Sequence, residues 1–352
     1  MRRRSHAARS AKARGAVTRR HLLKGAAASG SLAVAAPGLI RSARAQGLSK
    51  MTVAVATAPI EPNHHYFLYA KSLGYYKDAG IDVDIRSIQG DVNTLRAVIA
   101  GDVDVGNVGA YPSISAANAG ARIKNIGAVA PKFDSHIGAR KTITSLKELE
   151  GKSFAVSGIG DIAQVGPMLC IEQAGGDPNK VQWVTVGSGS VRIQGLISGA
   201  YQATAFNTVY IKRVTSYDYL HILAEQAQIL PKFVYTWEVA GPGILAKKEL
   251  LTKFWIATAR GARWGQEHPD DAVKISSKFL PDEPLEEISF QLDTYARNRH
   301  WNVDGVLPRD YWDFTSSALQ RHNLITQIPK YEDFVTNDFS LAARAALQAT
   351  PG

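Results

Sequence analysis

The stretch LGYYKDAGIDVD, residues 73–84, carries the chain from a helix into a strand. Apolar residues recur at helical spacing as far as Tyr76, which predicts a helix over residues 64–77 with one buried stripe. Gly80 is the kind of residue that commonly follows a helix end. Residues 81–85 then alternate apolar and acidic side chains, as a half-buried strand does. This stretch therefore predicts one helix-to-strand unit of an α/β protein.

The same rhythm continues on both sides of this unit. Short apolar runs predict strands at residues 52–57, 103–105, 123–130, 153–157, 182–186 and 203–206, and helical spacing predicts helices at residues 93–100, 112–119, 162–173 and 191–197. Strands that alternate with helices are typical of a mostly parallel sheet covered on both faces. From Lys247 onward the strands end, and helices are predicted at residues 250–268, 270–279, 285–297, 308–322 and 338–347.

Residues 1–45 have the composition of an export signal. They hold 11 of the 41 Lys and Arg residues and none of the 31 Asp and Glu residues. A basic segment that includes Arg19 and Arg20 precedes a mildly apolar segment, and Ala43-Arg-Ala45 offers small residues to a signal peptidase. The paired arginines resemble a twin-arginine signal, with Leu22 where phenylalanine is more usual. We therefore predict a signal peptide over residues 1–45 and a periplasmic protein exported by the twin-arginine route.

The rest of the chain is almost neutral, with 30 basic and 31 acidic residues after residue 45. This balance removes the main argument for nucleic-acid binding. No later run reaches the roughly 18 apolar residues that a membrane span needs. Cys170 is the only cysteine, so the chain can form neither an intrachain disulfide nor a thiolate metal cluster. We expect a soluble exported protein whose length is typical of two lobes.

Several stretches carry a resemblance to a known family, including Asp304-Gly-Val and Tyr331-Glu-Asp-Phe in the C-terminal part of the chain. Residues 73–84, residues 95–106 with the core Ala-Gly-Asp-Val-Asp, and residues 146–156, Leu-Lys-Glu-Leu-Glu-Gly-Lys-Ser-Phe-Ala-Val, follow one another in that family's order. The chain from about residue 50 to 345 resembles the periplasmic substrate-binding proteins of ABC importers, in the group that handles sulfonates, taurine, nitrate and thiamine pyrimidines. Some members of the same group are thiamine-pyrimidine synthases.

The resemblance implies an α/β fold of the type II periplasmic binding proteins. In that fold two lobes, each a mostly parallel sheet with flanking helices, are joined by two crossover segments, and the ligand is held in the hinge cleft. We predict that the crossovers lie near residues 130–140 and 232–245. The first lobe would then comprise residues 46–131 and 240–350, and the second lobe residues 132–239.

Ligands in such sheets bind beyond the carboxyl ends of the strands, where free N–H groups at helix N-termini attract anions. Four loops qualify by position, at residues 58–66, 107–111, 157–161 and 187–190. Aromatic side chains at loop and crossover positions are candidates to wall a pocket, although each also fits an ordinary core or surface position. The candidate ligand-binding residues are Pro59, Asn63, His64, Tyr66, Gln89, Asn107, Gly109, Tyr111, Phe133, Ser157, Gly158, Asp161, Ser188, Asn207, Tyr210, Trp237 and Glu238.

The adjacent histidines His64 and His65 raise the question of a metal. Neighbouring side chains point about 100° apart on a helix and to opposite faces on a strand, whereas a helical zinc site needs histidines four residues apart. We expect no metal here. One histidine is a candidate to bond a ligand, and the alternative is that both lie on the surface.

These observations favour an extracytoplasmic solute-binding protein that captures a small organic anion, of the sulfonate or carboxylate type. Its partners would be that small molecule and the permease and ATPase of an ABC importer, with no cofactor, no nucleic acid and no membrane contact except through the permease. A pyrimidine or nitrate remains an alternative ligand. An enzyme on the same scaffold is a further alternative, but the synthases carry a cysteine-rich motif that Cys170 alone does not supply. Ser157-Gly-Ile-Gly160 mimics a dinucleotide fingerprint without the acidic residue that should follow.

Overall fold

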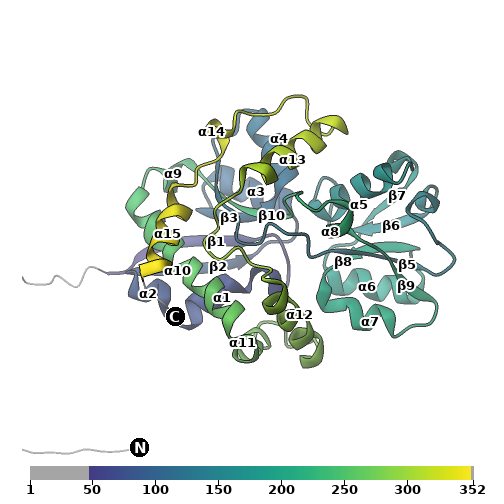
Figure 1. Cartoon of the computed structure of the whole chain (residues 1–352), viewed down its shortest axis with the longest axis horizontal. Helices are drawn as coiled ribbons and strands as arrows, with labels where there is room; N and C mark the ends of the chain where they lie inside the picture. The colour runs from purple at the N-terminus through teal and green to yellow at the C-terminus, as the bar shows by residue number, and fades with distance from the viewer. Residues whose placement is uncertain (1–46, 350–352) are drawn as a thin grey trace, which may run out of the picture. The chain divides into compact units, whose positions relative to one another are not determined.

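The computed structural model describes residues 47–349, which belong to one compact unit (Figure 1). The predicted signal peptide, residues 1–45, lies outside the described residues. Residues 47–349 contain two five-stranded sheets, each flanked by helices. This arrangement confirms the predicted two-lobed α/β fold.

The first sheet contains strands from both halves of the chain. Its members are β1 (Ser49–Val55), β2 (Ile81–Ser87), β3 (Val105–Gly109), β4 (Lys124–Gly127) and β10 (Thr236–Ala240), in the order β2-β1-β3-β10-β4. Strands β1, β2 and β3 run parallel, and β10 is antiparallel to both of its neighbours. We call this sheet with its helices the first lobe.

The second sheet repeats this plan. Its members are β5 (His136–Arg140), β6 (Ser153–Val156), β7 (Gln182–Thr185), β8 (Ala203–Phe206) and β9 (Leu220–Glu225), in the order β7-β6-β8-β5-β9. Here β6, β7 and β8 run parallel, and β5 is antiparallel to both of its neighbours. In each sheet, therefore, the strand that directly follows a crossover segment is antiparallel to both of its neighbours. We call this sheet with its helices the second lobe.

The chain passes between the lobes twice, at residues 128–135 and at residues 226–235. The predicted lobe boundaries stay predictions, and the second lobe predicted over residues 132–239 would include residues 236–239 of β10, which pairs within the first sheet. Strands β5, β9 and β10 were not predicted. All five residues of β10 are buried and pair with β3 and β4, but its sequence, Thr-Trp-Glu-Val-Ala, is not the continuous apolar run that is typical of a strand buried on both faces.

Helices cover both sheets. The α-helices are α1 (His65–Ser72), α2 (Tyr75–Asp78), α3 (Asp91–Ala100), α4 (Ala110–Asn118), α5 (Ile162–Gln173), α6 (Gly189–Ser198), α7 (Ile211–Thr215), α8 (Gln226–Ile229), α9 (Pro242–Leu245), α10 (Lys248–Glu267), α11 (Pro269–Ser276), α12 (Leu285–Asn298), α13 (Arg309–Arg321), α14 (Tyr331–Phe334) and α15 (Asp338–Ala349). Short 3-10 turns lie at η1 (Pro62–His64), η2 (Leu146–Leu149), η3 (Pro178–Lys180) and η4 (Thr208–Tyr210). The five predicted C-terminal helices correspond to α10, α11, α12, α13 and α15.

The helix predicted over residues 64–77 is divided into α1 and α2. Gly74 lies between them with φ of 81°, a left-handed conformation that ends a helix. Helix α1 packs closely on α10, where a Cβ atom added to Gly261 would lie 2.4 Å from the carbonyl oxygen of Tyr66. This contact holds α1, and with it the end of the loop after β1, against α10. No helix within residues 47–349 is both long and apolar enough to cross a membrane.

Candidate functional site

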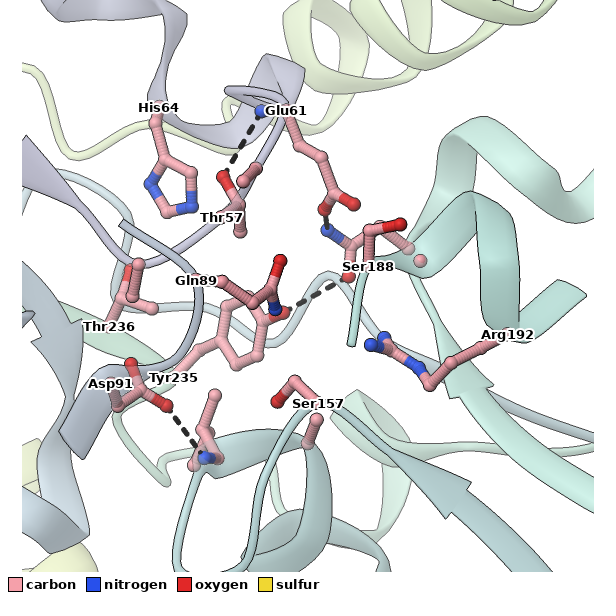
Figure 2. Close-up of a pocket in the computed structure, with 16 residues that line it drawn as sticks. Thr57, Glu61, His64, Gln89, Asp91, Ser157, Ser188, Arg192, Tyr235 and Thr236 are labelled. Carbon is pink, nitrogen blue, oxygen red and sulfur yellow. Dashed lines mark hydrogen bonds between the residues drawn. The ribbon is translucent and has the colours of Figure 1, made fainter. Parts of the chain in front are cut away.

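A small cavity lies between the two lobes, with a volume of about 50 Å³ (Figure 2). Water-sized groups need roughly 10–15 Å³ each on this measure, so the cavity holds about three to five of them. Its walls are Ala56, Thr57, Ala58, Glu61, His64, Gln89, Asp91, Ser157, Ile162, Ala163, Ser188, Gly189, Arg192, Asn207, Tyr235 and Thr236.

The cavity lies where the parallel strands end, as the topology rule for open α/β sheets expects. The first lobe contributes the loop after β1 and the start of α3, which follows β2. The second lobe contributes the loops after β6, β7 and β8. Three of the four loops predicted to face a ligand therefore line this cavity. The fourth, residues 107–111, does not.

Two helix N-termini at the cavity are already occupied by carboxylates of the opposite lobe. Asp91 in the first turn of α3 accepts a hydrogen bond from the backbone N–H of Ile162, the first residue of α5, at 2.8 Å. Asp161, which precedes α5, accepts one from the N–H of Val92 in α3 at 3.2 Å. Burial, and next the neighbouring Asp161 charge, raise the pKa of Asp91 to about 7. These two helix ends are thus unsuited to a second anion.

The N-terminus of α6 differs, because no side chain caps it. Within residues 47–349, the backbone N–H groups of Gly189, Ser190 and Val191 form no hydrogen bond. Such groups, together with the helix dipole, attract anions. Gly189 itself lines the cavity.

Arg192 adds a full positive charge in the first turns of α6, and its side chain is 7% exposed. Its Nε and Nη2 donate to the carbonyl oxygen of Ala205 at 3.4 and 3.2 Å, and its Nη1 donates to that of Gly187. Five N–H groups are available on a guanidinium, so one N–H on each terminal nitrogen is left over. None of the ion pairs within residues 47–349 includes Arg192. Figure 2 shows the guanidinium turned towards the cavity.

A chain of hydrogen bonds crosses the cavity from lobe to lobe. The Tyr235 hydroxyl donates to Asn207 Oδ1 at 3.0 Å, and Asn207 Nδ2 donates to Glu61 Oε2 (Figure 2). Burial raises the pKa of Glu61 to about 7, and the Arg192 charge partly opposes this rise. Glu61 comes from the loop after β1, so a first-lobe carboxyl group lies beside the second lobe's α6. The cavity therefore contains an arginine and two carboxyl groups with raised pKa values.

The two histidines have separate environments. His65 is fixed by Ser276 Oγ on Nδ1 and by the carbonyl oxygen of Ile60 on Nε2, both at 2.8 Å. His64 lines the cavity, is 3% exposed, and its buried Nδ1 has no hydrogen-bond partner. Burial lowers the pKa of His64 to about 3, so its ring is neutral at physiological pH. The pair therefore does not converge on one point, and His64 offers a free ring nitrogen next to the cavity.

The structure places five of the predicted ligand-binding residues at the cavity. They are His64, Gln89, Ser157, Ser188 and Asn207. Among them, the side chain of Gln89 points into the same space as the Arg192 guanidinium (Figure 2). Ligand contact by these five residues remains a prediction.

Three other predicted residues form a buried network in the core of the first lobe. The Tyr66 hydroxyl donates to Glu238 Oε1, and Asn107 Nδ2 donates to the same oxygen at 3.1 Å. Glu238 Oε2 accepts the backbone N–H of Val129 at 3.2 Å. Burial raises the pKa of Glu238 to about 7. This network ties β10 to β3 and α1, and none of the three residues lines the cavity.

The remaining predicted residues do not line the cavity. Asp161 and Gly109 take part in the contacts of α3 and α5, with the Gly109 N–H bonding Asp91 at 2.7 Å. Trp237 donates to Ser113 Oγ at 2.7 Å inside the core. The others are Asn63, bonded to His300; Phe133, packed on Tyr235; Tyr210, bonded to Glu283; Gly158, beside Asp161; Tyr111, half-buried on α4; and Pro59, which lines a separate groove.

Sequence reasoning missed the charged residues of the cavity. Glu61 belongs to the stretch EPNHHYF, residues 61–67, in which the histidines were considered and the glutamate was not. Arg192 follows the predicted loop 187–190 by two residues, a spacing that puts it in the first turns of the next helix. Asp91 similarly opens the helix after β2. A charged residue in the first turns after a predicted ligand loop was a usable signal for Arg192. It could not have found Glu61, which lies inside the predicted loop 58–66, or Asp91, which follows a loop that was not predicted to face a ligand.

The sequence of this chain matches the model of one protein family, described as NMT1/THI5 like, over residues 61–272. This match covers more than half of the chain. The chain belongs to the NMT1/THI5-like family. A curated relative is YtlA of Bacillus subtilis strain 168, itself described as a binding protein only by inference, with 21% identity over 307 residues, 83% of this chain and 89% of that protein.

Solved structures show that this family member has the fold of periplasmic binding proteins. A protein of Bordetella bronchiseptica RB50 matches with a TM-score of 0.73 and 18% identity, covering 85% of this chain and 98% of that one. The alkanesulfonate-binding protein SsuA of Xanthomonas axonopodis pv. citri, bound to MOPS, gives 0.66 and 14%, with 82% and 98% covered. The nitrate-binding protein NrtA of Synechocystis PCC 6803 gives 0.69 and 12%, with 86% and 90% covered. At these identities the likeness concerns the fold.

Proposed function

We propose that this protein is an extracytoplasmic solute-binding protein that captures a small organic anion, a carboxylate or a sulfonate, for an ABC importer. Family membership and the two-lobed fold support a substrate-binding role, and the predicted signal peptide supports a place outside the cytoplasm. The importer's permease and ATPase are the partners that such a role requires. Residues 47–349 would close on the ligand by a hinge motion at the two crossovers.

The environment of Arg192 is the observation that supports an anionic ligand. A buried guanidinium with two unused N–H groups lies beside the uncapped N-terminus of α6. A carboxylate or sulfonate offers paired oxygens that match these two N–H groups. The free ring nitrogen of His64 and the amide of Gln89 are then available to bond the rest of the ligand.

The size of the cavity limits which ligands fit. With a volume of about 50 Å³, it accepts roughly three to five water-sized groups. A short alkyl sulfonate or carboxylate fits this space, and an aryl compound fits only if the lobes stand further apart. Of the Phe, Tyr and Trp side chains in the described part of the chain, only Tyr235 lines the cavity.

Glu61 supports a second candidate, a pyrimidine. Its carboxyl group lies at the cavity and can accept a hydrogen bond from a ring or amino N–H group of such a ligand. An enzyme related to the synthases has less support, because Cys170 is fully buried in α5 and burial raises the pKa of its thiol to about 12, whereas a thiolate nucleophile needs a lowered pKa.

A thermal-shift comparison separates these candidates. The purified protein would be tested with acetate, methanesulfonate, taurine, nitrate, benzoate and hydroxymethylpyrimidine. A ligand present at 100 times its Kd adds about 2.7 kcal/mol of stability, which raises the midpoint of a protein of this length by roughly 4 °C. We expect this rise with a small carboxylate or sulfonate. A rise with the pyrimidine alone would refute the anion assignment in favour of the second candidate.

A further inference from the structure

Helices α3 and α5 belong to different lobes (Figure 1). Their N-termini meet across the cleft, where each forms a hydrogen bond with the other. The first N–H groups of any helix lack partners within that helix. Here each helix is capped by a carboxylate from the other lobe: Asp91 of α3 accepts the Ile162 N–H at 2.8 Å, and Asp161 before α5 accepts the Val92 N–H at 3.2 Å. Both carboxylates are almost fully buried, at 3% and 2% exposure. Each lobe therefore provides the carboxylate that caps a helix of the other lobe.

Each carboxylate is also anchored in its own lobe. The second oxygen of Asp91 accepts the Gly109 N–H at 2.7 Å, and that of Asp161 accepts the Ser157 hydroxyl at 2.9 Å. Each side chain therefore forms one bond within its lobe and one across the cleft. Opening the lobes breaks the two cross-cleft bonds and leaves the other two intact.

The backbone around Asp161 is shaped for this contact. A Cβ atom on Gly90, in the first lobe, would lie 2.8 Å from Asp161 Oδ2, and one on Gly158, in the second lobe, would lie 2.6 Å from the same oxygen. Both distances are shorter than a side chain allows, so two glycines, one from each lobe, make room for this carboxylate. The contact uses no ligand atom.

We propose that Asp91 and Asp161 are positioning residues that form a cross-lobe latch, which holds the lobes in this closed arrangement before any ligand binds. The latch supplies hydrogen-bond acceptors to the N-termini of both helices. Without it, the positive ends of the two helix dipoles would face each other. It goes beyond the proposed function, because it concerns closure and makes no claim about the ligand. A ligand then adds its own contacts to an arrangement that is already populated, and less of its binding energy is used to close the lobes.

Distances between spin labels on the full chain test the latch. Cysteines would replace Arg96 on α3 and Gln173 on α5, both exposed, and the buried Cys170 would stay unlabelled. Mass spectrometry of the denatured protein would first establish that the sample carries no small molecule. We expect one short-distance population in the unsubstituted protein, and a shift towards longer distances in Asp91→Asn and Asp161→Ala.

The expected shift is at least tenfold in the ratio of closed to open molecules, equal to about 1.4 kcal/mol. Asp104→Asn is the matched control, because Asp104 accepts the Thr52 N–H at 2.8 Å entirely within the first lobe. Gly158→Ala is a second way to disturb the latch, should the aspartate variants fold poorly. Unchanged distances in all latch variants would overturn the proposal. So would a ligand-free protein that is already mainly open, and neither result bears on whether an anion binds.

Discussion

Replacement of Arg192 by glutamine tests the assignment of the anion site. The variant keeps a polar side chain but removes the positive charge and the two N–H groups that no protein atom uses. Hydrogen bonds to charged groups contribute about 1.5–3 kcal/mol each, and loss of one partner of a buried charged pair costs about 2–5 kcal/mol. We expect a loss of about 3 kcal/mol in binding, which corresponds to roughly a 150-fold weaker Kd.

Isothermal titration of the purified variant with the anion found by thermal shift measures this loss. Arg192 also ties α6 to β8 through the carbonyl oxygen of Ala205, so the variant should be less stable as well as weaker in binding. Arg140→Gln is the matched control, because Arg140 donates to the carbonyl oxygens of Leu196 and Ile197 at the other end of α6, away from the cavity. It should lose stability and keep its Kd.

Arg192→Lys adds a finer comparison, because it retains the charge and loses the paired donors. Its Kd should lie between those of the unsubstituted protein and Arg192→Gln. A Kd within threefold of the unsubstituted value in Arg192→Gln would refute the reasoning, and so would an equal loss in the Arg140 control.

Three further predictions follow from the cavity and the core. Burial raises the pKa of Glu61 to about 7, and a bound anion raises it further, so the complex binds more protons than the ligand-free protein. Anion affinity should therefore fall as pH rises through 7, and Glu61→Gln should reduce that slope in titrations at pH 6 and 8. Gly261→Ala puts a Cβ atom 2.4 Å from the Tyr66 carbonyl oxygen and should cost about 1–3 kcal/mol in urea unfolding; an unchanged midpoint contradicts the packing of α1 on α10. Trp237→Phe removes the bond to Ser113 and should cost about 1–3 kcal/mol in stability with no change in Kd, whereas a weaker Kd would place Trp237 at the ligand.

Periodicity and turn residues were sufficient to predict most of the fold. The stretch at residues 73–84 gave a helix, a glycine and a strand, because local spacing records which face of each element is buried. Gly74 divided the helix in a way that periodicity does not reveal. Strand β10 was missed, because it is buried on both faces and pairs with β3, about 130 residues earlier in the chain.

The site was less predictable than the fold. The topology rule placed Ser157 and Ser188 beside a cleft, because it depends only on where strands end. Arg192 was missed, since an arginine near the start of a helix is usually solvated, and its burial depends on the carbonyl groups of β8 and of the loop after β7. Glu238 was placed at the cleft from its position near a crossover, and only the packing of Tyr66 shows that its carboxyl group lies in the core.

A crystal structure of the protein with its ligand would show whether the ligand's anionic group binds to Arg192. We expect the anionic group to lie at the N-terminus of α6, within hydrogen-bond distance of the Arg192 guanidinium and of the N–H groups of Gly189 and Ser190. An anionic group bound elsewhere would contradict this expectation. So would a ligand that contacts Glu61 and Asp91 through N–H groups and leaves Arg192 without a ligand atom.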